Sequence, residues 1–368
     1  MKQSPVRDVS RARRRPAAVR ELRLTPLMVS LVCMGLTPVL AQTLPTGFSP
    51  VAGDVAASQS GAVMTINQTS QRAIAQWQTF SIGAGGTVNV AQPSSSSILF
   101  NRVIGNEMST IAGKLTANGH VFLSNPNGVL FSGGSSVSVG GLVATTMKMA
   151  TSDSDFMNAA TRQFKFERTS APTPPNPDTN SYAVVNQGTI TATSPGATVA
   201  LMGSSVSNEA VINVARGSVG LVSADRVTVD FEGDGLTKFI IPSDSPTTSA
   251  LVKNSGTVTA DGGRIALMAA AGAKALVVNQ TGVLRANSIG SRNGEIILSA
   301  GRTTNGATAG YKSNGMVVSG TIEAEGGQVR MYSGQDITVT NLPPYVANSP
   351  TTVAPINAGS IINAVAVT

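Results

Sequence analysis

Residues 254–268 read NSGTVTADGGRIALM, and residues 318–332 read VSGTIEAEGGQVRMY. The two stretches align without a gap, and the matched positions are glycines and alternating apolar residues: Gly256 with Gly320, Val258 with Ile322, Ile265 with Val329. Further copies lie at residues 186–202, 208–224 and 279–300, and Ala210 takes the first glycine position of the second of these. A repeat spaced roughly 20 to 25 residues apart is typical of a solenoid.

Each repeat unit contains two short alternating runs around a turn, as half-buried strands do. A single unit cannot bury its apolar face, whereas stacked units bury a continuous core. Similar runs begin earlier, at residues 62–68, 86–92, 97–103 and 120–124. The sequence therefore predicts an all-β fold: a right-handed parallel β-helix, or solenoid, with an N-terminal cap and with hairpin or loop excursions.

Strand alternation also assigns faces within a unit. Ile265 is predicted to point into the core, where Ile265→Asp would bury an unpaired charge at a cost of several kcal/mol. Its neighbour Arg264 is predicted to point outward, so that Arg264→Asp should change stability by less than about 0.5 kcal/mol.

The first 41 residues are predicted to be a secretory signal peptide. Residues 1–23 carry eight Lys or Arg and two acids, and the uncharged apolar run LTPLMVSLVCMGLTPVLA follows at residues 24–41. Val39 and Ala41 supply small residues before a cleavage site between Ala41 and Gln42. A transmembrane anchor is the alternative, and two prolines in the run and the absence of charge just after it argue against an anchor.

Removal of this leader changes the charge and the redox chemistry of the chain. The leader holds +6 of the formal net charge of +7, so the mature chain is near +1 and a nucleic-acid partner is not expected. The one cysteine, Cys33, lies within the leader, so the mature chain forms no disulfide.

Few residues are suited to catalysis or metal binding, so no enzyme, cofactor or metal site is predicted. His120 is the one histidine, which excludes a multi-histidine metal cage, and it is expected to end a strand. The stretch DFEGDG resembles the start of a calcium loop through Asp230, Glu232, Asp234 and Gly235, but Ile241 occupies the twelfth position, where a bidentate Glu is needed. An acidic turn is therefore predicted there.

Other acids are also expected at turns. Asp153 and Asp155 are predicted to lie in a solvated turn, and Asp261, Glu295 and Glu323 at scattered turn-like positions. A β-helix polysaccharide lyase is an alternative, because parallel β-helices include such enzymes. Their sites need several acids together with Arg or Lys on adjacent coils, and the scattered acids here form no such stacked group.

The stretch SNPNGVLFSGG at residues 124–134 contains the turn Asn125-Pro126-Asn127-Gly128. Asn at the first position, Pro at the second and Gly at the fourth favour a type I turn. Together with GGLVATT at residues 140–146, this stretch closely resembles the secretion domain of filamentous-haemagglutinin-like exoproteins of bacterial two-partner secretion. The resemblance begins near Leu44 and extends through the later coils.

The resemblance implies that Asn125, Pro126, Asn127 and Gly128 form the first of two secretion motifs of the family. The second motif, Asn-Pro-Asn-Leu, has no match here, which leaves the subtype open. The implied partner is a TpsB-type outer-membrane β-barrel transporter with periplasmic POTRA domains, and the implied location is the cell surface or medium, reached through the periplasm.

The resemblance also implies a domain order and a choice of functions. Residues 42–168 are expected to form the N-terminal part of the two-partner-secretion domain, 169–182 a Pro-rich loop, and 183–368 a continuation of the same solenoid. Surface adhesion, to a receptor or glycan of a host or neighbouring cell, is the first functional interpretation. The alternatives are the secretion module of a longer haemolysin or toxin and, third, the lyase.

Overall fold

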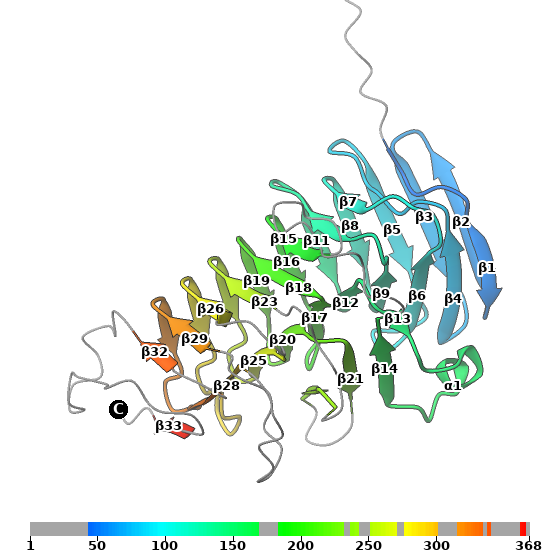
Figure 1. Cartoon of the computed structure of the whole chain (residues 1–368). Helices are drawn as coiled ribbons and strands as arrows, with labels where there is room; N and C mark the ends of the chain where they lie inside the picture. The colour runs from blue at the N-terminus through cyan, green and yellow to red at the C-terminus, as the bar shows by residue number, and fades with distance from the viewer. Residues whose placement is uncertain are drawn as a thin grey trace, which may run out of the picture. The chain divides into compact units, whose positions relative to one another are not determined.

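The computed structural model describes residues 43–168, 183–231, 236–242, 251–270, 276–300, 315–333, 337–339 and 361–365. The predicted leader with its Ala41–Gln42 cleavage site, the Pro-rich loop at 169–182 and residues 232–235 lie outside these ranges. The described chain is almost entirely β-structure, in which successive coils stack side by side (Figure 1). Among the described residues, no helix has the length and hydropathy of a membrane span.

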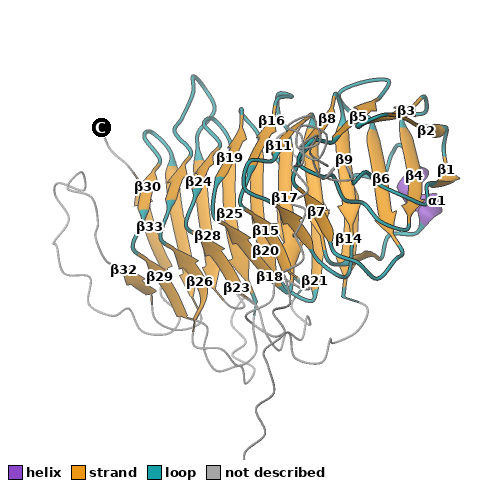
Figure 2. Cartoon of the chain, turned by 90° about the horizontal axis from the view of Figure 1, so that it is seen from above, coloured by secondary structure: helices purple, strands orange, loops and turns teal. Residues whose placement is uncertain are grey.

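Each complete coil places one strand in each of three sheets, which the described residues build with 8, 10 and 11 strands. Strands of neighbouring coils pair in parallel, and the antiparallel pairs of these sheets lie at their ends. The 8-stranded sheet contains β7 (Ser109–Ile111), β10 (Val129–Phe131), β15 (Ala183–Asn186), β18 (Ser205–Asn208), β23 (Leu251–Asn254), β26 (Leu276–Gln280), β29 (Gly315–Val318) and β32 (Ile337–Val339). Figure 2 shows the strands of successive coils running side by side across the stack.

The other two sheets complete the coils. The 10-stranded sheet contains β2 (Val55–Ser60), β3 (Val63–Gln68), β5 (Thr87–Ala91), β8 (Lys114–Ala117), β11 (Ser136–Val139), β16 (Thr189–Ala192), β19 (Val211–Val214), β24 (Thr257–Thr259), β27 (Val283–Arg285) and β30 (Thr321–Glu323). The 11-stranded sheet contains β1 (Ser49–Ala52), β4 (Arg72–Trp77), β6 (Ile98–Val103), β9 (His120–Ser124), β12 (Gly141–Thr145), β17 (Thr198–Gly203), β20 (Ser218–Ser223), β25 (Arg264–Ala269), β28 (Glu295–Ala300), β31 (Gln328–Ser333) and β33 (Ile361–Val365). The antiparallel pairs at the ends of these sheets are β1 with β4, β2 with β3 and β31 with β33.

The strand register confirms the predicted parallel β-helix and its repeats. Val258 pairs in parallel with Ile212 and Leu284, its counterparts one coil away on either side. Ile265 pairs likewise with Val219 and Ile296, and its side chain is fully buried, as predicted. Apolar side chains of equivalent positions therefore stack into one core inside the coils.

A ladder of buried amides runs through the 8-stranded sheet. Asn186 donates to Asn208, Asn208 to Asn254, and Asn254 to Gln280, each through a side-chain hydrogen bond of 2.7 Å. In the repeat at residues 279–300, the register thus places Gln280, not Asn279, at the ladder position. Each side-chain amide provides a hydrogen-bond partner for the next one. The burial of these polar groups in the core therefore costs little free energy.

The predicted N-terminal cap consists of two antiparallel strands. β1 pairs antiparallel with β4, and β2 pairs antiparallel with β3, so the chain reverses direction before the parallel coils begin. This is the start of the stack, drawn in blue in Figure 1.

The main excursion forms a second apolar core outside the coils. It contains the short helix α1 (Asp153–Met157) and an antiparallel four-stranded sheet of β13 (Lys148–Met149), β14 (Gln163–Glu167), β21 (Arg226–Asp230) and β22 (Lys238–Ile240). Its buried side chains, among them Phe156, Phe164 and Phe166, pack with Phe100 and Phe122 from the 11-stranded sheet. Because both of its faces are covered, β17 is buried at every position.

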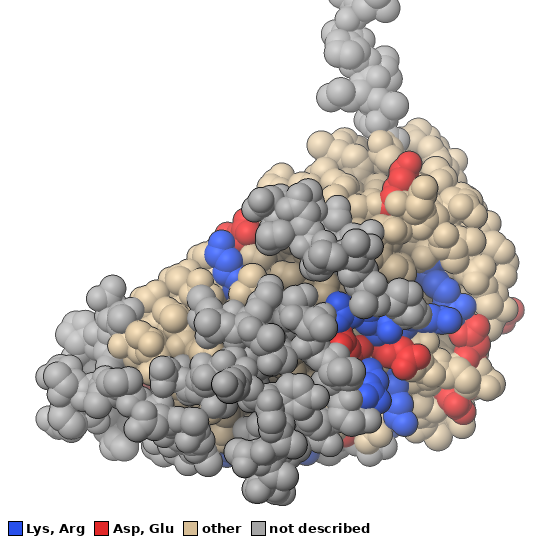
Figure 3. Space-filling view, in the orientation of Figure 1, with Lys and Arg blue, Asp and Glu red and all other residues tan. Residues whose placement is uncertain are grey.

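The outer side of this excursion is polar. Along β14, Gln163, Lys165 and Glu167 are exposed, while Phe164 and Phe166 between them are buried. Figure 3 shows Lys, Arg, Asp and Glu side chains gathered on the part of the surface over β14 and α1. Strand alternation thus gives this added sheet one face for the second core and one for water.

Candidate secretion motif

The turn Asn125–Gly128 joins β9 to β10 at a corner of one coil. The Gly128 N–H donates to the Asn125 backbone carbonyl at 3.1 Å, the i to i+3 bond of a β-turn. The Asn127 N–H donates to the Asn125 side-chain oxygen at 3.0 Å, which closes an Asx turn over the same residues. Gly128 has φ +125°, a conformation that residues with a Cβ rarely adopt.

The two asparagine side chains of this turn bind the corner of the preceding coil. The Asn125 amide donates to the Glu107 carbonyl and to the Ser109 hydroxyl, both at 2.9 Å. The Asn127 amide donates to the Gly105 carbonyl at 2.9 Å. The Asn125 side chain is fully buried, so its bonds replace those that water would otherwise make.

The turn is also joined to the following coil. The Asn125 backbone N–H donates to the carbonyl of Thr145 at 2.9 Å. Three successive coils therefore meet at this corner. Any change that displaces Asn125 disturbs the contacts of the turn with both neighbours.

Only part of the motif is accessible from outside. Pro126 is exposed and Asn127 is half-buried, whereas Asn125 and Gly128 are buried. Ile104, at the adjoining corner of the preceding coil, is 52% exposed. A partner that meets the folded chain can thus contact Pro126 and Ile104, but it cannot contact the Asn125 side chain.

Arg72 joins the excursion that contains α1 to the coil stack, and this role was not predicted from the sequence. Its guanidinium donates to backbone carbonyls at the end of helix α1 and just after it, among them that of Thr161 at 2.7 Å, and lies over the Phe156 and Phe164 rings. Burial lowers the pKa of Arg72, and the charge of Arg162 lowers it further. Arg72 thus fixes the excursion to β4, the first strand of the 11-stranded sheet that has a parallel neighbour.

His120 does not form a catalytic arrangement in the described structure. It lies at the start of β9, half-buried, with its ring edge-on to Phe231 at 6.2 Å between centroids. Burial lowers the pKa of His120 to about 4. Its register partner Gly141 leaves room for the ring, since a Cβ there would lie 2.3 Å from Nδ1.

The acids singled out in the sequence are only partly at turns. Asp230 lies in β21 and accepts a hydrogen bond from Gln163 at 3.2 Å, and the rest of the predicted acidic turn lies outside the described residues. The prediction of a solvated turn at Asp153 and Asp155 was wrong. Both residues begin α1, where Asp153 pairs with Arg102 at 2.6 Å. No group of three or more His, Cys, Asp or Glu among the described residues is placed to hold a metal ion.

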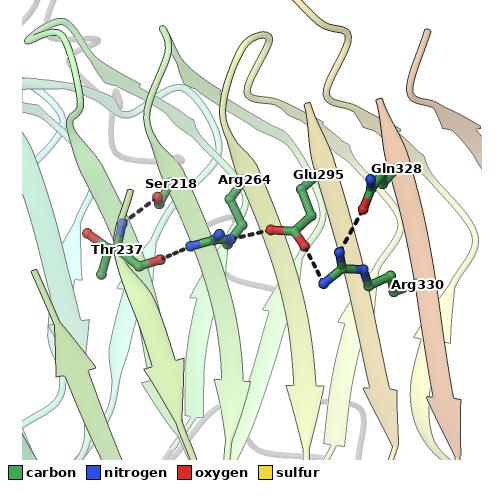
Figure 4. A network of polar contacts seen from close by, with 6 residues as sticks. All are labelled: Ser218, Thr237, Arg264, Glu295, Gln328 and Arg330. Atoms are coloured by element: carbon green, nitrogen blue, oxygen red, sulfur yellow. Dashed lines mark hydrogen bonds and ion pairs between the residues drawn. The ribbon is translucent and has the colours of Figure 1, made fainter. Parts of the chain in front are cut away.

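Glu295 and Arg264 also differ from their predicted settings. Glu295 lies in strand β28 between two arginines: Arg264 Nε donates to it at 2.6 Å, and Arg330 Nη1 lies 3.0 Å from its other oxygen (Figure 4). The Arg264 side chain is 12% exposed, so it is not the freely solvated position that the alternation suggested. The prediction that Arg264→Asp is nearly silent is therefore withdrawn.

Comparison with known proteins identifies the domain. The family profile described as TPS secretion domain matches residues 41–338. A Heme/hemopexin-binding protein of Haemophilus influenzae is 32% identical over 286 residues, which cover 76% of this chain and 30% of that protein. A second Heme/hemopexin-binding protein of H. influenzae is 39% identical over 127 residues, or 34% of this chain and 14% of that protein. The chain thus spans less than a third of the length of these curated relatives.

A solved structure shows the same fold. The HMW1 secretion domain from Haemophilus influenzae matches with a TM-score of 0.60 at 29% identity, over 76% of this chain and 66% of that one. The resemblance drawn from the Asn-Pro-Asn-Gly turn and its surroundings is thereby confirmed. The chain belongs to the TPS secretion-domain family, that is, to the exoproteins of two-partner secretion.

Proposed function

We propose that this chain is exported across the outer membrane by a dedicated TpsB-type β-barrel transporter. The observation that carries the proposal is the TPS secretion domain itself, which occupies residues 41–338 and holds the Asn125–Gly128 corner near the start of the coil stack. The leader ending at Ala41 would first take the chain to the periplasm, with Gln42 as the new N-terminus. Folded coils would then accumulate outside the cell.

The sequence and topology suit passage through a narrow barrel in an unfolded state. Cys33 is the single cysteine and precedes Gln42, so no disulfide can lock the mature chain in the periplasm. Each coil pairs with the coil before it, so folding can proceed in the order in which coils emerge. Burial of apolar side chains on each new coil opposes return of the chain.

We further propose that the transporter meets the Asn125–Gly128 segment before it folds. Its POTRA domains would pair their strand edges with extended segments of this chain. In support, the folded turn buries the Asn125 side chain and commits both asparagine amides to neighbouring coils. An unfolded segment offers the side chains of Asn125, Pro126 and Asn127 and the backbone of Gly128 to a partner.

The activity of the exported protein at the surface is a separate proposal. We favour adhesion, while relatives named for heme and hemopexin binding make ligand capture by a longer exoprotein the second candidate. A lyase finds less support, because the one acid among the network residues of Figure 4, Glu295, is paired with two arginines.

The direct test is export in a Gram-negative host with and without the cognate transporter. The proposal predicts that the chain reaches the medium only when the transporter is present and remains in the periplasm otherwise. Equal release in both strains would refute it. The N-terminal mass of the released chain tests cleavage after Ala41 in the same experiment.

A further inference from the structure

Among the described residues, three edge strands lie at the N-terminal end of the stack, and two of them are closed. At β7, Ile82 donates its N–H to the Thr110 carbonyl at 2.9 Å and accepts from Ala112 at 2.7 Å, so a bridging residue covers that edge. At β1, Pro50 lacks an N–H, and the register with β4 shifts between Pro50 and Ala52. Prolines and irregular register are the usual means by which proteins prevent an edge from pairing further.

The third edge, β2, has neither device. Its sequence VAASQS has no charge and no proline, and its antiparallel register with β3 is unbroken from Val55 to Ser60. In the described part of the chain, β2 has a strand on one side only. A flat, uncharged edge of this kind is a template for another strand.

The hydrogen-bond alternation shows which groups of β2 are available. The Thr69 N–H donates to the Asp54 carbonyl at 2.9 Å, which fixes Asp54 as a hydrogen-bonded position of the pair. By alternation, the even-numbered residues of β2 pair with β3. The backbone N–H and C=O groups of Val55, Ala57 and Gln59 therefore face the open side.

We propose that β2 pairs with β2 of a second copy of this chain, antiparallel, across a two-fold axis at Ala57. In this register Ala57 faces Ala57 of the second copy, and Val55 faces Gln59 of the second copy. The two-fold axis repeats the Val55–Gln59 pair, so three pairs face each other. All three are of the hydrogen-bonded type, and each exchanges two bonds, which gives about six N–H to O=C bonds across the axis. The contact is isologous and closes on itself as a dimer.

Two features favour a second copy over a strand of another protein. The side chains of β2 are small and uncharged, so self-pairing brings no like charges opposite one another. Apolar side chains also gather at this end: Val51 is 41% and Val63 38% exposed, and Val55 and Ala57 are half-buried against the end of the core. The six residues of β2 carry no charge that would select a strand of another protein.

The small contact predicts a weak, reversible dimer. A six-residue edge with a few flanking side chains falls below the roughly 1,000 Å² that stable specific interfaces bury. We therefore expect dissociation in the micromolar range or above. The dimer concerns the folded, secreted chain, so it does not depend on how the chain is exported.

Sedimentation velocity of the purified secreted chain across the micromolar range tests the proposal, with a monomer–dimer equilibrium as the expected result. Ala56 and Ser58 are exposed and would face each other across the axis, Ala56 of one copy opposite Ser58 of the other. Ala56→Lys with Ser58→Lys should abolish the dimer by repulsion, and Ala56→Glu with Ser58→Glu should do the same. Mixing the two variants should restore a dimer, which a merely misfolded variant cannot do.

Two further variants complete the test. Ser136→Lys with Ser138→Lys places the same charges on exposed positions of β11, an interior strand of the same sheet, and should leave the dimer intact. Ala57→Pro removes an outward N–H without removing a bond to β3, and should weaken the dimer. A wild-type chain that stays monomeric, a dimer that persists in the lysine variant, or a mixture that stays monomeric would each overturn the proposal.

Discussion

The side-chain amide of Asn127 donates a 2.9 Å hydrogen bond to the backbone carbonyl of Gly105, which occupies the equivalent corner one coil earlier. Gly105 is itself held close to the coil before it, since a Cβ there would lie 2.1 Å from the Gln78 carbonyl. The motif residue therefore joins two coils whose corners stack closely.

Asn127→Ala should lower the free energy of unfolding by about 1–2 kcal/mol, because it removes the bonds to Gly105 and to the Asn125 side chain and leaves a carbonyl without its donor. Urea unfolding followed by circular dichroism measures the change. Ser138→Ala, on an exposed position of β11, should stay within about 0.5 kcal/mol. Equal midpoints for Asn127→Ala and wild type would show that the contact adds nothing.

Ile265→Asp should destabilise the chain by several kcal/mol, because its carboxylate would lie fully buried between Val219 and Ile296. Arg264→Asp should also destabilise, by about 1–3 kcal/mol, because it removes one partner of Glu295 and places a like charge beside it. Arg264→Gln, which keeps a donor, should have a smaller effect. An Arg264→Asp variant as stable as wild type would show that the Figure 4 network contributes little.

Arg72→Met should loosen the excursion that contains α1. The carbonyls after α1 would lose a charged donor, which we expect to cost about 2–4 kcal/mol. In limited proteolysis of this variant, cleavage near residues 156–161 should occur much earlier in time than cleavage within the coils. Arg285→Gln is the control, since the Arg285 side chain is 44% exposed and pairs at the surface with Asp261. Identical cleavage patterns for Arg72→Met and wild type would argue against the tether.

His120 should make stability depend on pH. Burial lowers its pKa to about 4 in the folded chain, against 6.5 when unfolded. As pH falls from about 6.5 to 4, His120 binds a proton in the unfolded state but not in the folded state. The free energy of unfolding therefore decreases over this range, by about 3 kcal/mol in total. Unfolding free energies of wild type and His120→Asn measured across this range isolate the effect. A constant difference between the two proteins would contradict a half-buried imidazole that stays neutral in the folded chain.

Repetition explains why much of the fold could be predicted from the sequence. Alternation within each run places Val258 and Ile265 in the core, and the repeat spacing places their counterparts one coil away. Parallel pairing follows because each repeat offers the same apolar row to its neighbours. The Asn125–Gly128 turn was also predictable, since its residue types each suit one turn position.

The parts that were not predicted depend on contacts between residues that are distant in sequence. Arg72 donates to carbonyls more than 80 residues later in the sequence, and no local sequence pattern predicts such a bond. Glu295 was expected at a turn-like position, whereas the register of β28 places it in a strand beside Arg264 of the neighbouring coil. The second core was not predicted, because Phe156, Phe164 and Phe166 belong to an excursion that has no counterpart in the other coils.

If the Asn125–Gly128 segment directs export, changes in it must alter the fraction of chain that a transporter-bearing strain releases to the medium. Asn127→Ala with Gly128→Val should lower that fraction several-fold, with the protein retained or degraded in the periplasm. Asn254→Ala is the matched control, because it removes comparable amide bonds to Asn208 and Gln280 but lies outside the motif. Release of Asn254→Ala near the wild-type level is expected. Equal release of the motif variant and wild type would contradict the account.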